Sequence, residues 1–113
     1  MKRAIKKRTI LHHYLHAALW CEGLDDKDIE DILPASITNA RKDIKLFVDT
    51  NKKLLEQSGL SDEQIGHDFW LTRNGHGAGF WDREIGKVGD KLTNACKKFT
   101  TINLFNEAQV IIE

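Results

Sequence analysis

The amino-acid sequence predicts a mainly helical α+β domain, with about four helices and a β-hairpin at the C-terminus. In three segments the apolar residues recur at steps of three and four, which is the spacing of one face of an α-helix. The C-terminal end instead holds two short runs rich in β-branched side chains, which favours strands. The 113 residues, 41% hydrophobic and 30% charged, suit a single domain with one core, spanning residues 1–113.

The first helix is predicted from about Arg3 to Cys21, with one apolar stripe, and Glu22-Gly23 ends it. His12 and His16 lie four residues apart on one face, with His13 beside them. A metal site needs a third ligand. None is evident nearby, so we interpret these histidines as solvated surface residues.

Residues 24–33 are acidic and predict a loop with a helical turn. Pro34 fits the first turn of a second helix, because its missing N–H has no partner there in any case. Helical spacing continues to about Gln57, and Ser58-Gly59 ends it. This helix is expected to be about 35 Å long and to form the spine of the domain.

Ser61 and Gln64 predict a capping box that opens a third helix, ending near Arg73 with Asn74-Gly75 as a left-handed stop. The alternative is a strand over 69–73 followed by a hairpin turn at 74–75. We favour the helix because the cap is explicit.

The chain from 77 to 79 is predicted to be irregular or extended, followed by a helix over 87–99. The runs 102–105 and 109–112 predict a terminal hairpin. A two-stranded hairpin is marginal alone, so it should pack on the helices or recruit residues 78–81 as a third strand.

Charge and cysteine content narrow the function classes. The 17 basic and 17 acidic residues give a net charge of zero, which argues against coating of nucleic acid and against an acidic DNA mimic. Two cysteines outside any CxxC pair suit a reduced compartment. No apolar run is long enough to span a membrane. We therefore expect a cytoplasmic protein.

Residues 66–83, GHDFWLTRNGHGAGFWDR, crowd aromatic, glycine and ionisable residues into one stretch. The segment HDFWLTRNGHGAGFWDR at 67–83, followed by GDKLTNACKKF at 89–99, resembles a widespread family of small tailed-phage and prophage proteins. The ALW at 18–20 resembles the family's N-terminal part more loosely. The resemblance implies a phage origin and hence the host bacterial cytoplasm, and it implies no activity.

A phosphate-bearing or nucleotide-like ligand is the first hypothesis for this stretch. Glycine allows the backbone N–H groups of 74–79 to turn inward as an anion nest, and two arginines flank it. Tryptophan rings would stack a base, and aspartates would read its edge or a ribose. The predicted ligand-binding residues are His67, Asp68, Trp70, Arg73, Asn74, Gly75, His76, Gly77, Trp81, Asp82 and Arg83.

Two other functions stay open, and so does the question whether the protein is an enzyme. The residues Trp70, Phe80, Trp81 and Arg73 would also suit a patch that binds and inhibits a host enzyme. His67, His76, Asp68 and Asp82 offer bases and metal ligands for a small phosphodiesterase or nuclease. However, the stretch lacks HExxH, HxH and DxD spacings, and no metal site or cofactor is predicted.

A purely structural interpretation accounts for part of the same stretch. Its aromatic residues are also suited to the core, and its glycines to a tight crossover. Asp82 would then cap the next helix or pair with Arg73. Packing alone does not call for Arg73, Asn74 and His76, so these three favour a function.

Overall fold

The computed structural model describes residues 4–76 and 79–113. In chain order the elements are α1 (Lys7–Cys21), the 3₁₀ turn η1 (Ile29–Asp31), α2 (Pro34–Thr50), α3 (Lys52–Ser58), α4 (Asp62–Arg73), the 3₁₀ turn η2 (Phe80–Asp82), α5 (Lys87–Cys96), β1 (Leu104–Asn106) and β2 (Val110–Ile112). The predicted mainly helical α+β class is confirmed, although the described residues form five α-helices rather than about four.

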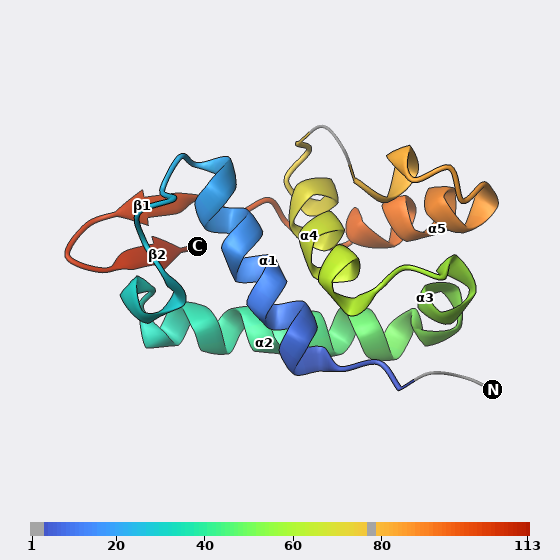
Figure 1. The fold of residues 1–113 in the computed structure, drawn as a ribbon, viewed down its shortest axis with the longest axis horizontal. Helices are drawn as coiled ribbons and strands as arrows, with labels where there is room; N and C mark the ends of the chain where they lie inside the picture. Colours follow the sequence, from blue (N-terminus) through green and yellow to red (C-terminus); the bar gives the residue numbers. More distant parts are fainter. Residues whose placement is uncertain (1–3, 77–78) are drawn as a thin grey trace.

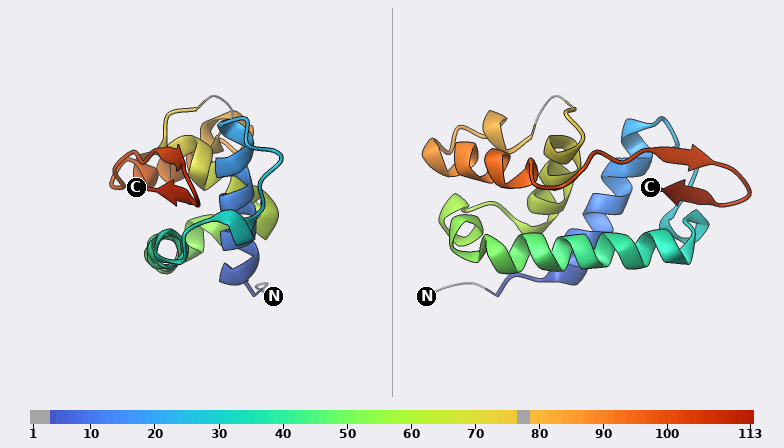
Figure 2. Two further views of the ribbon diagram at one scale, coloured as in Figure 1. Left: turned by 90° about the vertical axis from the view of Figure 1, so that its left-hand side faces the viewer. Right: turned by 180° about the vertical axis from the view of Figure 1, so that it is seen from behind.

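The helices pack in two layers around one core. Helix α2 lies along one side of the molecule, α1 crosses it, and α4 packs most extensively on α1 (Figure 1). Helix α5 packs on α3 and η2 at one end, and the hairpin lies at the other end (Figure 2).

The contact between α1 and α4 depends on a glycine. A Cβ atom at Gly66 would collide with the carbonyl oxygen of Ile10 and lie 3.0 Å from the backbone nitrogen of Tyr14. Only glycine lets the two helix backbones approach this closely. The crossing therefore brings the neighbours of Gly66 in α4 against the side chains around Tyr14 in α1.

Stacked aromatic rings fill the core. The rings of Phe47 and Phe69 are parallel with centroids 4.2 Å apart, and Phe80 lies 5.8 Å from Phe47. Trp70 meets Tyr14 edge-on at 5.3 Å. Most aromatic residues of the 66–83 stretch thus build the core, as the structural interpretation expected.

The long helix predicted over 34–57 is broken into α2 and α3. Asn51 leaves the helical conformation, with φ −117° and ψ 24°, and its side-chain amide donates to the Phe47 carbonyl (2.9 Å). Asparagine competes for helix carbonyls in this way, which explains the break. The single spine of about 35 Å was therefore a wrong prediction. Gly59, with φ +70°, ends α3 where the sequence predicted a stop.

The helical interpretation of the third segment is correct and the strand alternative is wrong, since residues 62–73 form α4. The Ser61 hydroxyl accepts from the Gln64 N–H (3.1 Å), but the other half of the predicted capping box is missing. The Gln64 amide instead donates to Asp68 (2.8 Å). Gly75 is left-handed at the helix end, with φ +69°, as predicted.

The terminal hairpin forms with the register Leu104–Ile112, Phe105–Ile111 and Asn106–Val110. Its described neighbour is the chain before α2, because Leu33 donates to the Val110 carbonyl (2.8 Å) and Ile32 bridges Val110. The expected third strand over 78–81 was wrong for residues 80 and 81, which lie in η2, and Ala78 falls outside the described residues.

Candidate functional site

The residues predicted to bind a ligand differ widely in exposure. Asp68, Trp70 and Arg73 are buried, His67, Asn74 and Arg83 are half-buried, and Gly75, His76, Trp81 and Asp82 are exposed. Gly77 lies outside the described residues. The predicted protein-binding patch is not continuous on the surface, because of its four residues only Trp81 is exposed.

Arg73, in the last turn of α4, is a buried junction between distant parts of the chain. Its Nη1 donates to the Asp43 carboxylate (2.6 Å) and to the Tyr14 hydroxyl (3.1 Å). Its Nε donates to the Thr100 carbonyl (2.7 Å), and its guanidinium lies 5.4 Å from the Phe99 ring centroid. Arg73 therefore ties α4 to α1, to α2 and to the segment after α5.

The suggested roles of Asp82 do not occur. Arg73 forms its ion pair with Asp43 rather than with Asp82. Helix α5 begins at Lys87 after Gly86, which supplies no side-chain cap.

Arg73 also borders a cavity of about 320 Å³ between α2 and α5. Leu46, Phe47, Ala95 and Phe99 give the cavity an apolar lining, and Lys98 also lines it. The hydrogen bonds that hold Arg73 in the protein are made by Nε and Nη1. Arg73 therefore contributes to the lining of a mainly apolar cavity.

Arg83 is held by the fully buried carboxylate of Asp68. Its Nε donates to Oδ2 (2.9 Å) and its Nη2 to Oδ1 (2.7 Å), which is the strong, two-pronged geometry of arginine and carboxylate. This hydrogen bonding raises the pKa of Arg83, against the opposing effect of partial burial. The pair offsets the cost of a buried carboxylate and fastens the segment after η2 onto α4.

Four of the five histidines gather where α1 and α4 meet. The rings of His12 and His16 are 4.5 Å apart, and His13 lines a cavity of about 350 Å³ together with His67 and Arg83. Burial, followed by the neighbouring His12, lowers the pKa of His13, and Glu63 opposes this shift.

The α1 histidines were predicted to be solvated, and His12 alone among the three is exposed. His13 and His16 are half-buried, and the distance in sequence hid the approach of His67. The glycine at position 66 was the one sequence signal for it, since a buried glycine within a helix often marks a close helix crossing.

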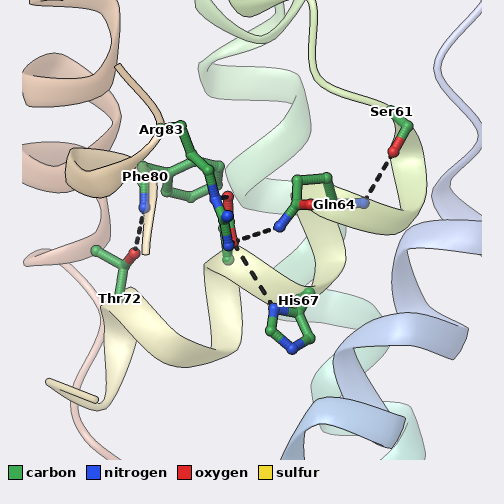
Figure 3. Close-up of polar contacts among 7 residues, drawn as sticks. Ser61, Gln64, His67, Thr72, Phe80 and Arg83 are labelled. Carbon is green, nitrogen blue, oxygen red and sulfur yellow. Dashed lines mark hydrogen bonds and ion pairs between the residues drawn. The ribbon is translucent and has the colours of Figure 1, made fainter. Parts of the chain in front are cut away.

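The turn after α4 uses its backbone donors within the protein. The N–H groups of Gly75 and His76 donate to carbonyls of α4, and the Phe80 N–H donates to the Thr72 hydroxyl (3.1 Å; Figure 3). The Asn74 side chain accepts from the Ile102 N–H (2.8 Å) and donates to the Trp70 carbonyl (3.0 Å). These groups close the helix end instead of facing outward as an anion nest.

Within residues 4–76 and 79–113, no group of three or more His, Cys, Asp or Glu side chains is arranged to hold a metal ion.

Among the described residues, the structure contains no helix of the length and apolar character needed to cross a membrane.

Comparison with known proteins finds no matching family model, no matching curated protein and no matching solved structure.

Proposed function

We propose that this is a small phage-encoded accessory protein that acts by binding, and that its ligand occupies the cavity beside Arg73. The proposed ligand carries a phosphate or similar anionic group on a flat apolar body, as a mononucleotide does. The phage origin rests on the resemblance of residues 67–83 and 89–99. Interference with a host defence or metabolic pathway would suit such a protein.

The observation that carries the proposal is the position of Arg73 at the edge of an apolar cavity, where the protein engages its Nε and Nη1. An apolar cavity with a few convergent polar groups is the usual form of a small-molecule site. Arginine donates well to phosphate because its N–H groups are always charged and fixed in one plane.

The charge balance of the cavity favours an anion. Asp43 neutralises Arg73 at 2.6 Å, and Lys98 then leaves one net positive charge at the cavity. An anionic group would contact Arg73 Nη2 and the Lys98 ammonium, while a ring lies against Phe99 and Ala95.

The size of the cavity limits the ligand. Its volume of about 320 Å³ is at the lower end of the range of roughly 300–1,000 Å³ for ligand pockets. A mononucleotide or a smaller aromatic phosphate suits this volume better than a dinucleotide does.

A thermal-shift assay with AMP, GMP, CMP and phenyl phosphate tests the proposal without disturbing Arg73. Ala95→Leu fills the cavity from α5, and Lys98→Ala removes the positive charge that Lys98 brings to the cavity. Lys97→Ala is the matched control, since Lys97 is exposed and does not line the cavity.

At least one probe should raise the melting temperature of the wild type and of Lys97→Ala equally. Lys98→Ala should raise the dissociation constant of that probe about tenfold, as expected for the loss of one charge-assisted hydrogen bond. Ala95→Leu should abolish the shift. An equal shift in Ala95→Leu, or no shift with any probe at millimolar concentration, would contradict the proposal.

A further inference from the structure

The crossing of α1 and α4 brings two histidines, one from each helix, to the lining of one cavity. Gly66 lies against the backbone of Ile10 and Tyr14, and this close approach brings α4, with His67 next to Gly66, against α1, which carries His13. His13, His67 and Arg83 line the same cavity of about 350 Å³. Burial is the main cause that lowers the pKa of His13, and His67 makes the smallest contribution to the same shift.

We propose that this cavity is a second, catalytic site, at which His13 and His67 cleave the phosphodiester backbone of single-stranded RNA without a metal ion. The site lies apart from the cavity beside Arg73 and has its own lining residues. It does not depend on the binding function proposed above.

The surroundings of the two histidines assign them different roles. The Nδ1 of His67 is buried, has no hydrogen bond to a described residue and lies 3.8 Å from Asp68 Oδ1. In the proposed reaction the other ring nitrogen of His67, Nε2, serves as the general acid.

His13 suits the role of general base. Burial and the positive fields of His12, His16 and His67 favour its neutral form, and Glu63 is the one facing group that opposes them. A neutral imidazole at neutral pH can accept a proton from a hydroxyl.

The proposed reaction is internal transesterification, which needs no co-reactant. His13 takes the proton of the ribose 2′-OH, and the 2′ oxygen attacks phosphorus. The bond from phosphorus to the 5′ oxygen breaks, and His67 donates its proton to that oxygen. The products are a 2′,3′-cyclic phosphate and a 5′-hydroxyl, and exchange with solvent restores both histidines.

Two neighbouring groups support a nucleic-acid substrate. Arg83 uses Nε and Nη2 for Asp68, and in the proposed complex its Nη1 would bind a phosphate oxygen. Trp20 is 62% exposed and its ring lies 6.1 Å from the His67 ring. An exposed indole at this position can stack a flanking base.

The test uses a fluorogenic DNA oligonucleotide with one internal ribonucleotide, in buffer with EDTA, from pH 5 to 8. The variants are His13→Gln and His67→Gln, which keep a polar side chain of similar size but cannot transfer the proton. His76→Gln is the matched control, because His76 is exposed and does not line the cavity. All proteins are purified identically and checked for unchanged melting temperature.

The wild type and His76→Gln should cut at the ribonucleotide with a bell-shaped pH profile and leave a 2′,3′-cyclic phosphate. His13→Gln and His67→Gln should each be slower by about 100-fold or more, and the all-DNA oligonucleotide should stay intact. No cleavage by the wild type, or equal rates in His67→Gln and His76→Gln, would overturn the proposal.

Discussion

Arg73 and Arg83 show how strongly the role of a side chain depends on partners far away in sequence. Both were predicted to flank a phosphate, and each is held by a carboxylate of the protein itself. Arg73 contacts residues 27, 30 and 59 positions away. No local pattern indicates such contacts, so the sequence marked Arg73 as unusual without revealing its partners.

Removal of Arg73 should therefore destabilise the fold rather than only weaken a ligand. Arg73→Ala leaves the Asp43 carboxylate and the Tyr14 hydroxyl without their donor. We expect the free energy of unfolding to fall by about 3 kcal/mol, at the lower end for a broken buried pair because Asp43 is partly hydrated. Urea denaturation measures the loss, with the exposed Arg41→Ala as control. A loss below about 1 kcal/mol for Arg73→Ala would refute the structural role.

The buried Tyr14 should make the protein sensitive to alkali. Burial raises its pKa to about 12 in the folded state, against the lowering effect of Arg73, while the unfolded value is near 10. The folded state then holds the phenol proton more tightly. The contribution of the protonated Tyr14 phenol to stability is complete below pH 10. As the pH rises from 10 to 12 this contribution is lost, and the free energy of unfolding falls by roughly 2–3 kcal/mol.

Cys96 should extend this sensitivity to lower pH, because burial raises the pKa of its thiol to about 12 from an ordinary value near 9. Urea titrations at pH 8, 10 and 11 should show falling stability, and Tyr14→Phe should flatten the fall above pH 10. A free energy of unfolding that stays constant from pH 8 to pH 11 would contradict the raised pKa values of Tyr14 and Cys96.

At the scale of elements, the α1–α4 crossing is the contact most sensitive to a small change. Gly66→Ala would drive a methyl group into the Ile10 carbonyl, which is backbone and has little room to move. We expect a loss of about 3 kcal/mol or more, even though alanine favours a helix by nearly 1 kcal/mol.

Gly89→Ala in α5 is the matched comparison for Gly66→Ala. Its added Cβ would meet the Phe80 carbonyl at 2.8 Å, a milder clash. The loss measured by chemical denaturation should be smaller for Gly89→Ala. The reverse order would contradict the close crossing.

Element positions were largely predictable because local signals set them. The serine cap at Ser61 and the left-handed Gly59 and Gly75 define helix ends that are visible in the sequence. The break at Asn51 was not predictable, since the apolar spacing continues through it and only the asparagine side chain diverts the backbone.

At the scale of the whole molecule, the 66–83 stretch both stabilises the helix packing and contributes residues to two cavities. Its buried aromatic residues and its two paired arginines hold the helices together. Arg73 and His67 also border two cavities, each completed by residues outside the stretch. Sequence could indicate that stretch, but the cavities arise only when α1, α2 and α5 pack around it.

The most direct test of the central claim is a ¹H–¹⁵N NMR titration of the assigned protein with AMP and with phenyl phosphate. Ligand in the cavity beside Arg73 should shift the amide signals of Leu46, Ala95, Lys98 and Phe99, together with the Arg73 Nε–H, and leave Gly75, His76 and Trp81 unchanged. Shifts confined to the turn at Gly75–Trp81, or spectra unaltered at millimolar ligand, would contradict binding in this cavity.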